Sequence, residues 1–255
     1  MRDKIKDVSK KTAALFIAAV LVLCTGGIMA AKAALNVVSP AYDAELDLAK
    51  VMDITILEGS GDSVSDAGAT EAVLNAFKMS DGKTVNVSPG KVYDETLAIK
   101  NNSSRPMYVR MIVRKYWKDE KGNKATYADG EIKLDPKFIK LTYKGSAYNS
   151  DSWIKSAGES TDECNVYYYK SILTGTTDPL FDGVSLDRSV MDEYTTSSEK
   201  NNGKNVITYE YKYDKCSICL EAEAQAVQTH NAEDAIKSIW GVDATLSGGS
   251  IQSIK

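Results

Sequence analysis

The 255-residue sequence is poor in the residues on which most enzyme active sites depend, with one histidine (His230) and four cysteines. A single histidine excludes the HExxH zinc-protease motif and leaves a Ser-His-Asp triad without support. Neither a GxSxG elbow nor a phosphate-binding glycine loop is present. The formal net charge of -4 also lacks the concentrated basic face that nucleic acid requires. We therefore expect no enzyme, no cofactor and no nucleic-acid partner.

The cysteines are too few for a disulfide scaffold. After removal of a leader, Cys164, Cys216 and Cys219 remain. Three cysteines allow one disulfide bridge and leave one free thiol; the pattern also fits a protein that is exported into reducing surroundings. The only CxxC, at 216–219, suggests a zinc half-site or a redox pair. Residues three apart on a strand face opposite sides, however, and no second CxxC exists. We therefore expect structural cysteines, with Cys216 on the buried face and Cys219 on the other.

Two further groups of side chains admit a binding interpretation beside a plainer one. The first group consists of Asp178, Asp182, Asp187 and Asp192, whose carboxylate oxygens are of the kind that binds calcium. Their spacing is not that of an EF-hand loop. We therefore favour a solvated acidic loop and assign no metal ligand. The second group consists of Trp153, Tyr167, Tyr168 and Tyr169, which form a candidate surface for sugar or protein binding. Their spacing along strands, however, favours core positions for the aromatic rings.

The first 33 residues have the pattern of an export signal. A basic start precedes the nearly uncharged stretch 12–31, and Ala31-Lys32-Ala33 fits the small-x-small pattern for cleavage before Ala34. We expect a cleaved signal peptide and a secreted protein at the cell surface or in an extracellular matrix. The alternative is an uncleaved membrane anchor, because about 18 apolar residues can span a bilayer.

Most of the remaining chain has the two-residue period of β-strands. Leu97 and Ile99 share one face of a first strand, which a polar turn at 101–106 connects to a second strand. The second strand places Met107, Val109, Met111 and Val113 on its buried face, and Tyr108, Ile112 and Tyr116 on a partly covered face. We expect this pair at the centre of an antiparallel sheet.

Other segments give less regular patterns. We expect a polar loop over 58–69, a short helix over 70–78 and a long β stretch over 207–227 that bends or bulges at Asp214-Lys215. A second helix is predicted over 232–240, capped by Asn231 and ended by Gly241. Its inward side chains are Ala235, Ile236, Ile239 and Trp240.

Many strands, irregular loops and little helix indicate an all-β fold. We predict an antiparallel β-sandwich of jelly-roll or Greek-key type with one or two short helices. Residues 34–246 form this single domain, and 247–255 form a flexible tail rich in glycine and serine.

Several short segments in order resemble the TasA/camelysin family, bacterial exported proteins processed by a SipW-type signal peptidase. These segments are the leader 1–33, Val87-Ser88-Pro89-Gly90, Lys100-Asn101-Asn102, Tyr108-Val109-Arg110, Trp153, the stretches 167–170 and 172–173, Thr176-Thr177 with Leu180-Phe181, the stretch 222–228, and Trp240-Gly241. The chain departs from the family pattern in segment 34–57, in the polar loop 58–69 and in its three cysteines.

The resemblance implies a jelly-roll sandwich that builds biofilm matrix fibres, with itself, the signal peptidase and other matrix or cell-surface components as partners. One branch has been described as a metalloprotease, an activity for which this chain lacks the histidines. Fibre subunits donate their mature N-terminal strand to a neighbour, and Leu35, Val37 and Val38 are the candidate donor side chains. An ordinary first strand or a disordered terminus is the alternative for this segment. The alternative function is a monomeric surface adhesin or ligand-binding module.

Overall fold

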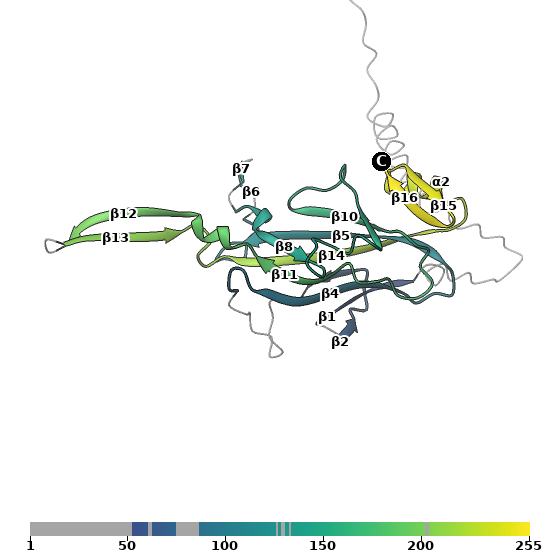
Figure 1. Cartoon of the computed structure of the whole chain (residues 1–255), viewed down its shortest axis with the longest axis horizontal. Coiled ribbons are helices and arrows are strands. Elements are labelled where there is room, and N and C mark those ends of the chain that lie inside the picture. Colours follow the sequence, from purple (N-terminus) through teal and green to yellow (C-terminus); the bar gives the residue numbers. More distant parts are fainter. Residues whose placement is uncertain are drawn as a thin grey trace, which may run out of the picture. The chain divides into compact units, whose positions relative to one another are not determined.

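The protein is an all-β antiparallel sandwich in the part of the chain that the computed structural model describes (Figure 1). The described residues are 53–60, 63–74, 87–125, 127–128, 131–132, 134–201 and 204–255. They all belong to one of the chain's two compact units, residues 47–255. The leader and the candidate donor Leu35, Val37 and Val38 lie outside the described residues.

Two five-stranded sheets form the sandwich, and every strand pairing in them is antiparallel. The first sheet has the order β2-β1-β4-β11-β8, with the bounds β1 Ile54–Ser60, β2 Ser63–Asp66, β4 Val92–Asn101, β8 Ile139–Thr142 and β11 Phe181–Leu186. The second has the order β3-β14-β5-β10-β9, with the bounds β3 Glu71–Val73, β5 Met107–Lys118, β9 Trp153–Lys155, β10 Cys164–Tyr169 and β14 Ser217–Gln228.

The smaller elements lie outside these two sheets. Three two-stranded sheets pair β6 with β7, β12 with β13 and β15 with β16. Their bounds are β6 Tyr127–Ala128, β7 Glu131–Ile132, β12 Tyr194–Asn201, β13 Lys204–Tyr211, β15 Ala244–Ser247 and β16 Ser250–Ile254. The helical elements are the 3-10 turns η2 Pro136–Phe138 and η3 Arg188–Asp192 and the helix α2 Ala232–Trp240.

The central pair of strands confirms the period-two prediction. Leu97 and Ile99 of β4 are fully buried, and β5 buries its four predicted inward side chains in the same core. The opposite face of β5 is covered as well, because Tyr108 and Ile112 belong to a second apolar cluster. A strand that is covered on both faces reads as a nearly continuous apolar run, as β5 does.

Helix α2 and the β15–β16 hairpin provide that second cover. Ile236 and Trp240 pack with Tyr108 and Ile112, and Ile251 of β16 is buried among them. The helix therefore has the predicted bounds, and Gly241 ends it at a φ of 76° that favours glycine. Two expectations need correction here. Ile239 points to solvent rather than inward, and 247–255 is a paired strand with a buried anchor rather than a frayed tail.

Two predictions near the start of the described chain were also wrong. The loop expected over 58–69 contains β2, which pairs with β1 from Leu57↔Asp66 to Ser60↔Ser63. The helix expected from Thr70 begins instead as β3, which pairs with Glu221–Glu223 of β14. The small and polar residues that predict a loop are compatible with short edge strands, where the neighbouring strand supplies the hydrogen bonds.

The long β stretch predicted over 207–227 is divided between two different sheets. β13 ends at Tyr211, a turn follows with Lys215 at a φ of 58°, and β14 begins at Ser217. The expected change of phase at Asp214-Lys215 is therefore a turn between strands rather than a bulge within one. This turn directs β13 away from the sandwich and into a separate ribbon with β12.

Candidate assembly surface

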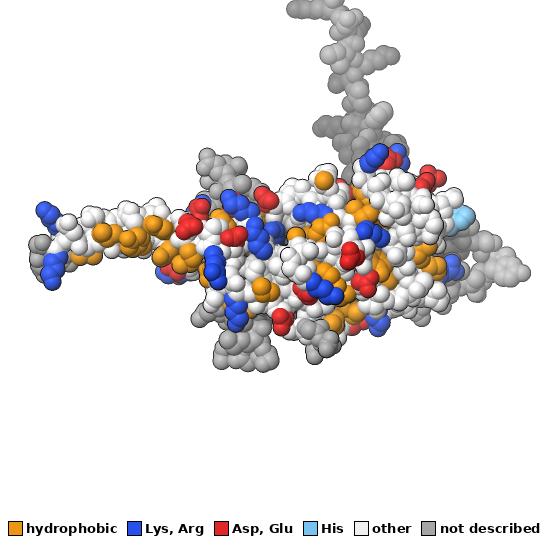
Figure 2. Space-filling model, in the orientation of Figure 1, with side chains coloured by type: hydrophobic (Ala, Val, Ile, Leu, Met, Phe, Trp, Pro, Cys, Tyr) orange, Lys and Arg blue, Asp and Glu red, His pale blue; other side chains and the backbone are white. Residues whose placement is uncertain are grey.

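The β12–β13 hairpin contributes almost nothing to the core of its own domain. It begins after β11 and η3 and returns the chain to β14 (Figure 1). All eight residues of β13 are exposed, including Ile207 at 58% and Tyr209 at 55%. Figure 2 shows hydrophobic side chains in a row along this hairpin. Exposed apolar side chains that form a contiguous row often mark an interaction surface.

The register of the hairpin makes it amphipathic. Tyr194 lies opposite Tyr211, Thr196 opposite Tyr209 and Ser198 opposite Ile207, so these residues share one face. The other face carries Thr195, Ser197, Glu199, Val206, Thr208 and Glu210. We call the first the aromatic face: Tyr194 packs edge-on against Tyr209 and Tyr211, with ring centroids 5.4 and 5.7 Å apart.

The base of the hairpin is fixed to the sandwich by Tyr213. Its ring lies 4.8 Å from that of Trp117 and 5.5 Å from that of Phe138. Its hydroxyl accepts a hydrogen bond of 2.9 Å from the backbone N–H of Asp135. The alternation that the sequence shows in Tyr209, Tyr211 and Tyr213 therefore ends with one anchored ring and two exposed rings.

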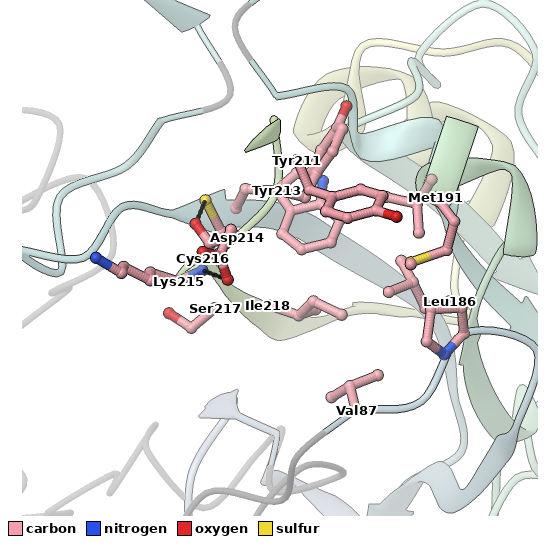
Figure 3. A pocket seen from close by; sticks show the side chains of 13 residues that line it. Val87, Leu186, Met191, Tyr211, Tyr213, Asp214, Lys215, Cys216, Ser217 and Ile218 are labelled. Carbon is pink, nitrogen blue, oxygen red and sulfur yellow. Dashed lines mark hydrogen bonds between the residues drawn. The ribbon is translucent and has the colours of Figure 1, made fainter. Parts of the chain in front are cut away.

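A groove lies beside this anchor (Figure 3). Its volume is about 520 Å³, and its apolar lining includes Val87, Leu186, Met191 and Ile218. The tyrosines and Met191 come from the hairpin side and Val87 from the segment before β4 (Figure 3). The groove is large enough for a side chain or a small ligand, and its polar lining residues include Asp214, Lys215 and Ser217.

The aromatic residues considered as a surface site are mostly buried instead. Trp153 is 1% exposed, and Tyr167 and Tyr168 are also buried, so the surface-binding interpretation is wrong and the core interpretation is confirmed. The Trp153 indole N–H donates to the carbonyl oxygen of Asp178 at 3.1 Å. The hydroxyl of Tyr168 donates to Glu159 at 2.7 Å, and only Tyr169 is partly exposed.

The expectation for the CxxC cysteines is only partly met, because Cys216 lies just before β14 and is half-buried, whereas Cys219 is buried. Cys216 contacts the sandwich core, Cys219 is buried on the other side beside Tyr116, and all three thiols are free. Burial raises the pKa of Cys164 and of Cys216, so it disfavours their reactive thiolates.

The acidic residues considered for calcium have separate local roles. Asp178 accepts from the hydroxyl of Ser152, Asp182 from the N–H of Lys144, and Asp187 caps η3. Among the described residues, no group of three or more His, Cys, Asp or Glu side chains is arranged to hold a metal ion.

Two carboxyl groups lie together inside the first sheet, which no sequence motif indicated. Glu95 of β4 and Glu58 of β1 have the inward parity of Leu97 and Ile56 and are buried. The pKa of Glu95 is raised to about 9, mainly by burial and also by the charge of Glu58 and a hydrogen bond with it. Glu95 is therefore neutral at pH 7, with Oε1 lacking a hydrogen-bond partner among the described atoms.

The second sheet also holds an inward ionisable group, Lys115 of β5. Its ammonium donates across the core to the carbonyl oxygen of Ile139 at 2.5 Å. The pKa of Lys115 is lowered to about 8, mainly by burial and also by the nearby charge of Lys140. The hydrogen bond from Lys115 to Ile139 therefore joins the two sheets directly.

The second sheet leaves part of β14 without an outer neighbour. β3 pairs with Glu221–Glu223 of β14, and backbone hydrogen bonds on either side of β3 extend this contact to Leu220 and Ala224. Within the described ranges, β5 is the only strand that pairs with Gln225–Gln228. An unpaired strand edge can template the addition of another strand.

No family model, curated protein or solved structure matches this chain. Within the described residues, no helix has the length and apolar character needed to cross a membrane.

Proposed function

We propose that this protein is an exported structural subunit of the bacterial cell surface or biofilm matrix. In this proposal the subunits assemble into fibres by donating the segment after the cleaved leader to a neighbouring copy. Signal peptidase acts on the leader, and other matrix or surface components are the further partners. The proposal extends the resemblance to the TasA/camelysin family.

The observation that carries the proposal is the open stretch Gln225–Gln228 of β14. This stretch has a partner on one side only among the described residues, and it contains the fully buried Val227. A donated strand at this place gains main-chain hydrogen bonds, and its alternate side chains give the register. The four-residue segment Leu35-Asn36-Val37-Val38 matches the length of the stretch.

The first experiment compares two forms of the secreted protein by electron microscopy. The form that begins at Ala34 is expected to give concentration-dependent filaments, and a form that begins at Glu45 to remain a folded monomer. N-terminal sequencing of secreted protein establishes where the mature chain begins. Equal polymerisation of the two forms would exclude strand donation.

A matched pair of substitutions tests the donor side chains. Val37→Asp places a charge where the proposal requires an apolar side chain, and we expect filaments to be lost. Asn36→Asp introduces the same charge at the neighbouring position, whose side chain points to the opposite side of a strand. We expect this control to polymerise.

A ligand-binding surface module is the second candidate function, and the apolar groove beside Tyr213 favours it. In that case the secreted protein remains a monomer and retains a glycan or a host protein. Neither function requires catalysis. We expect no protease activity on casein and no stoichiometric zinc; chelator-sensitive activity would overturn this expectation.

A further inference from the structure

Among the described residues, no strand pairs with the outer edge of β13, which is long and regular. Its eight residues pair with β12 without a register shift, and the hairpin contains no proline. Natural proteins protect such edges with bulges, proline, covering elements or charged side chains, and of these only charged side chains, Lys204 and Glu210, are present along β13 in the described chain. A ribbon of only two strands is also marginally stable in water. A third strand on this edge would complete it.

Charge indicates which strand fits. Lys204 and Glu210 stand on the same face of β13, at equal distances from Ile207. If a second copy of β13 runs antiparallel with Ile207 opposite its own equivalent, Lys204 comes opposite Glu210 of the second copy. Symmetry repeats this pair, so two opposite-charge pairs flank a central apolar contact. Among the described residues, neither Lys204 nor Glu210 forms an ion pair.

We propose that β13 pairs antiparallel with β13 of a second copy about a two-fold axis at Ile207. The result is a four-stranded sheet made from two hairpins. Cross-strand neighbours keep the same face in antiparallel pairing, so the two aromatic faces become one continuous surface. Asn205 then stands opposite Tyr209 of the second copy on that surface.

Neighbouring registers are less favourable. A shift that centres the pairing on Thr208 places Lys204 opposite Lys212 of the second copy, and like charges directly opposite destabilise a sheet. Self-pairing of β12 about Ser198 places Ser197 opposite Glu199 and Thr196 opposite Lys200, without opposite-charge pairs. Of the pairings compared, the one centred on Ile207 is the only one that places opposite charges directly across from each other.

The pairing does not rest on fibre formation. A two-fold contact closes after two copies, whereas strand donation from head to tail continues along a filament. The hairpin contact therefore gives dimers of free subunits, and it gives lateral links where subunits are held in fibres. The two kinds of contact can be tested separately.

The first test is a symmetric cross-link in the full-length chain. Directly opposite residues of an antiparallel pair have Cα atoms about 4.5–5.5 Å apart, which is within the range of a disulfide. Ile207→Cys is therefore expected to form a covalent dimer under mild oxidation, with the bridge mapped by mass spectrometry to the substituted position in both copies. Ser198→Cys is the control: it shares the face, but three strand spacings of about 4.8 Å separate the two copies.

The second test introduces charge changes into the Ile207→Cys chain. Lys204→Glu alone and Glu210→Lys alone each place like charges opposite one another at both pairs, and we expect dimerisation to weaken about tenfold or more. Mixing the two charge variants restores both opposite-charge pairs between unlike chains, so the cross-link should return as a heterodimer. Lys200→Glu, on β12 of the same hairpin, is the matched control and should cross-link like the parent chain.

Three outcomes would overturn the proposal: no excess cross-link of Ile207→Cys over the unsubstituted chain, equal cross-linking of Ser198→Cys, or charge variants that dimerise without change. Failure of the proposed fibre function leaves a different trace. The form that begins at Ala34 would then give no filaments, or the form that begins at Glu45 would polymerise equally, whatever the cross-link of Ile207→Cys shows.

Discussion

The strands β5 and β13 both carry apolar side chains at alternate positions, but their environments are opposite. Met107, Val109 and Met111 of β5 are fully buried, whereas Ile207 and Tyr209 of β13 are more than half exposed. A two-residue period therefore establishes that a strand has an apolar face, without establishing what covers that face. β5 is covered by its own domain. We infer that the apolar face of β13 is used between molecules.

The largest expected effect is at the buried indole of Trp153. Trp153→Ala leaves a cavity and removes the donor to the carbonyl oxygen of Asp178, so we expect the free energy of unfolding to fall by about 3–5 kcal/mol. Chemical denaturation at pH 7 measures this loss. A change below about 1 kcal/mol would contradict the assignment of Trp153 to the core, and would revive its role as a surface residue.

The second prediction concerns the cover on the outer face of β5. Ile251→Ala, at a side chain that is 1% exposed, is expected to lower the free energy of unfolding by about 2 kcal/mol or more. Ile239→Ala removes the same atoms from the exposed side of α2 and should change it by less than about 0.5 kcal/mol. Equal effects of the two substitutions would mean that β15–β16 does not anchor the C-terminal segment.

The sandwich was predictable from sequence because its pattern is dense and locally consistent. β4 and β5 combine strict alternation with a turn rich in Asn, Ser and Pro, and the helix ends at Gly241 as predicted. Short edge strands were missed because β2 and β3 are held by neighbouring backbone rather than by apolar side chains. The Ser and Asp residues of β2 resemble a loop, and the Glu-Ala-Val sequence of β3 was interpreted as part of a helix.

The candidate assembly surface could be predicted only in part. The alternation of Ile207, Tyr209 and Tyr211 in the sequence places them on one face of a strand, but their exposure depends on the turn after Tyr211, which the sequence indicates only as a bend or bulge. The carboxyl pair of Glu58 and Glu95 left no signal, because the two residues are far apart in sequence and meet only through the β1–β4 register. Pairing across strands is set by tertiary structure, which a single sequence does not display.

The third prediction uses this carboxyl pair to test the interior through pH. The pKa of Glu95 is raised to about 9 in the folded protein, against an ordinary value near 4.5, so the folded state holds a proton that the unfolded state loses. Its stabilisation is complete below pH 4.5 and is lost as the pH rises toward 9. Glu95→Gln removes this dependence.

We therefore expect Glu95→Gln and the unsubstituted chain to be similar in stability at pH 5. At pH 9 the variant should be more stable by several kcal/mol, because the pKa of Glu95 rises from 4.5 to about 9 on folding and each pKa unit corresponds to about 1.4 kcal/mol. Its Tm should be higher accordingly. Thermal unfolding at both pH values measures the difference. Parallel stability profiles from pH 5 to pH 9 would show that Glu95 is not held neutral in the core.

The last prediction makes the same change, isoleucine to alanine, in both regions, and one of the two variants has the smallest expected effect on stability. Ile99→Ala removes a fully buried side chain from β4 and should cost about 2–5 kcal/mol of the free energy of unfolding. Ile207→Ala removes the same atoms from β13, where the side chain is already in water within one subunit, so the free energy of unfolding of the dilute protein should change by less than about 0.5 kcal/mol.

At high protein concentration the same variant should lose the dimer, because Ile207 stands at the proposed two-fold axis. A substitution that leaves the subunit intact and removes only the association separates a side chain that serves the fold from one that serves a partner. A cost above about 2 kcal/mol for Ile207→Ala in dilute protein would show that the hairpin packs on its own domain.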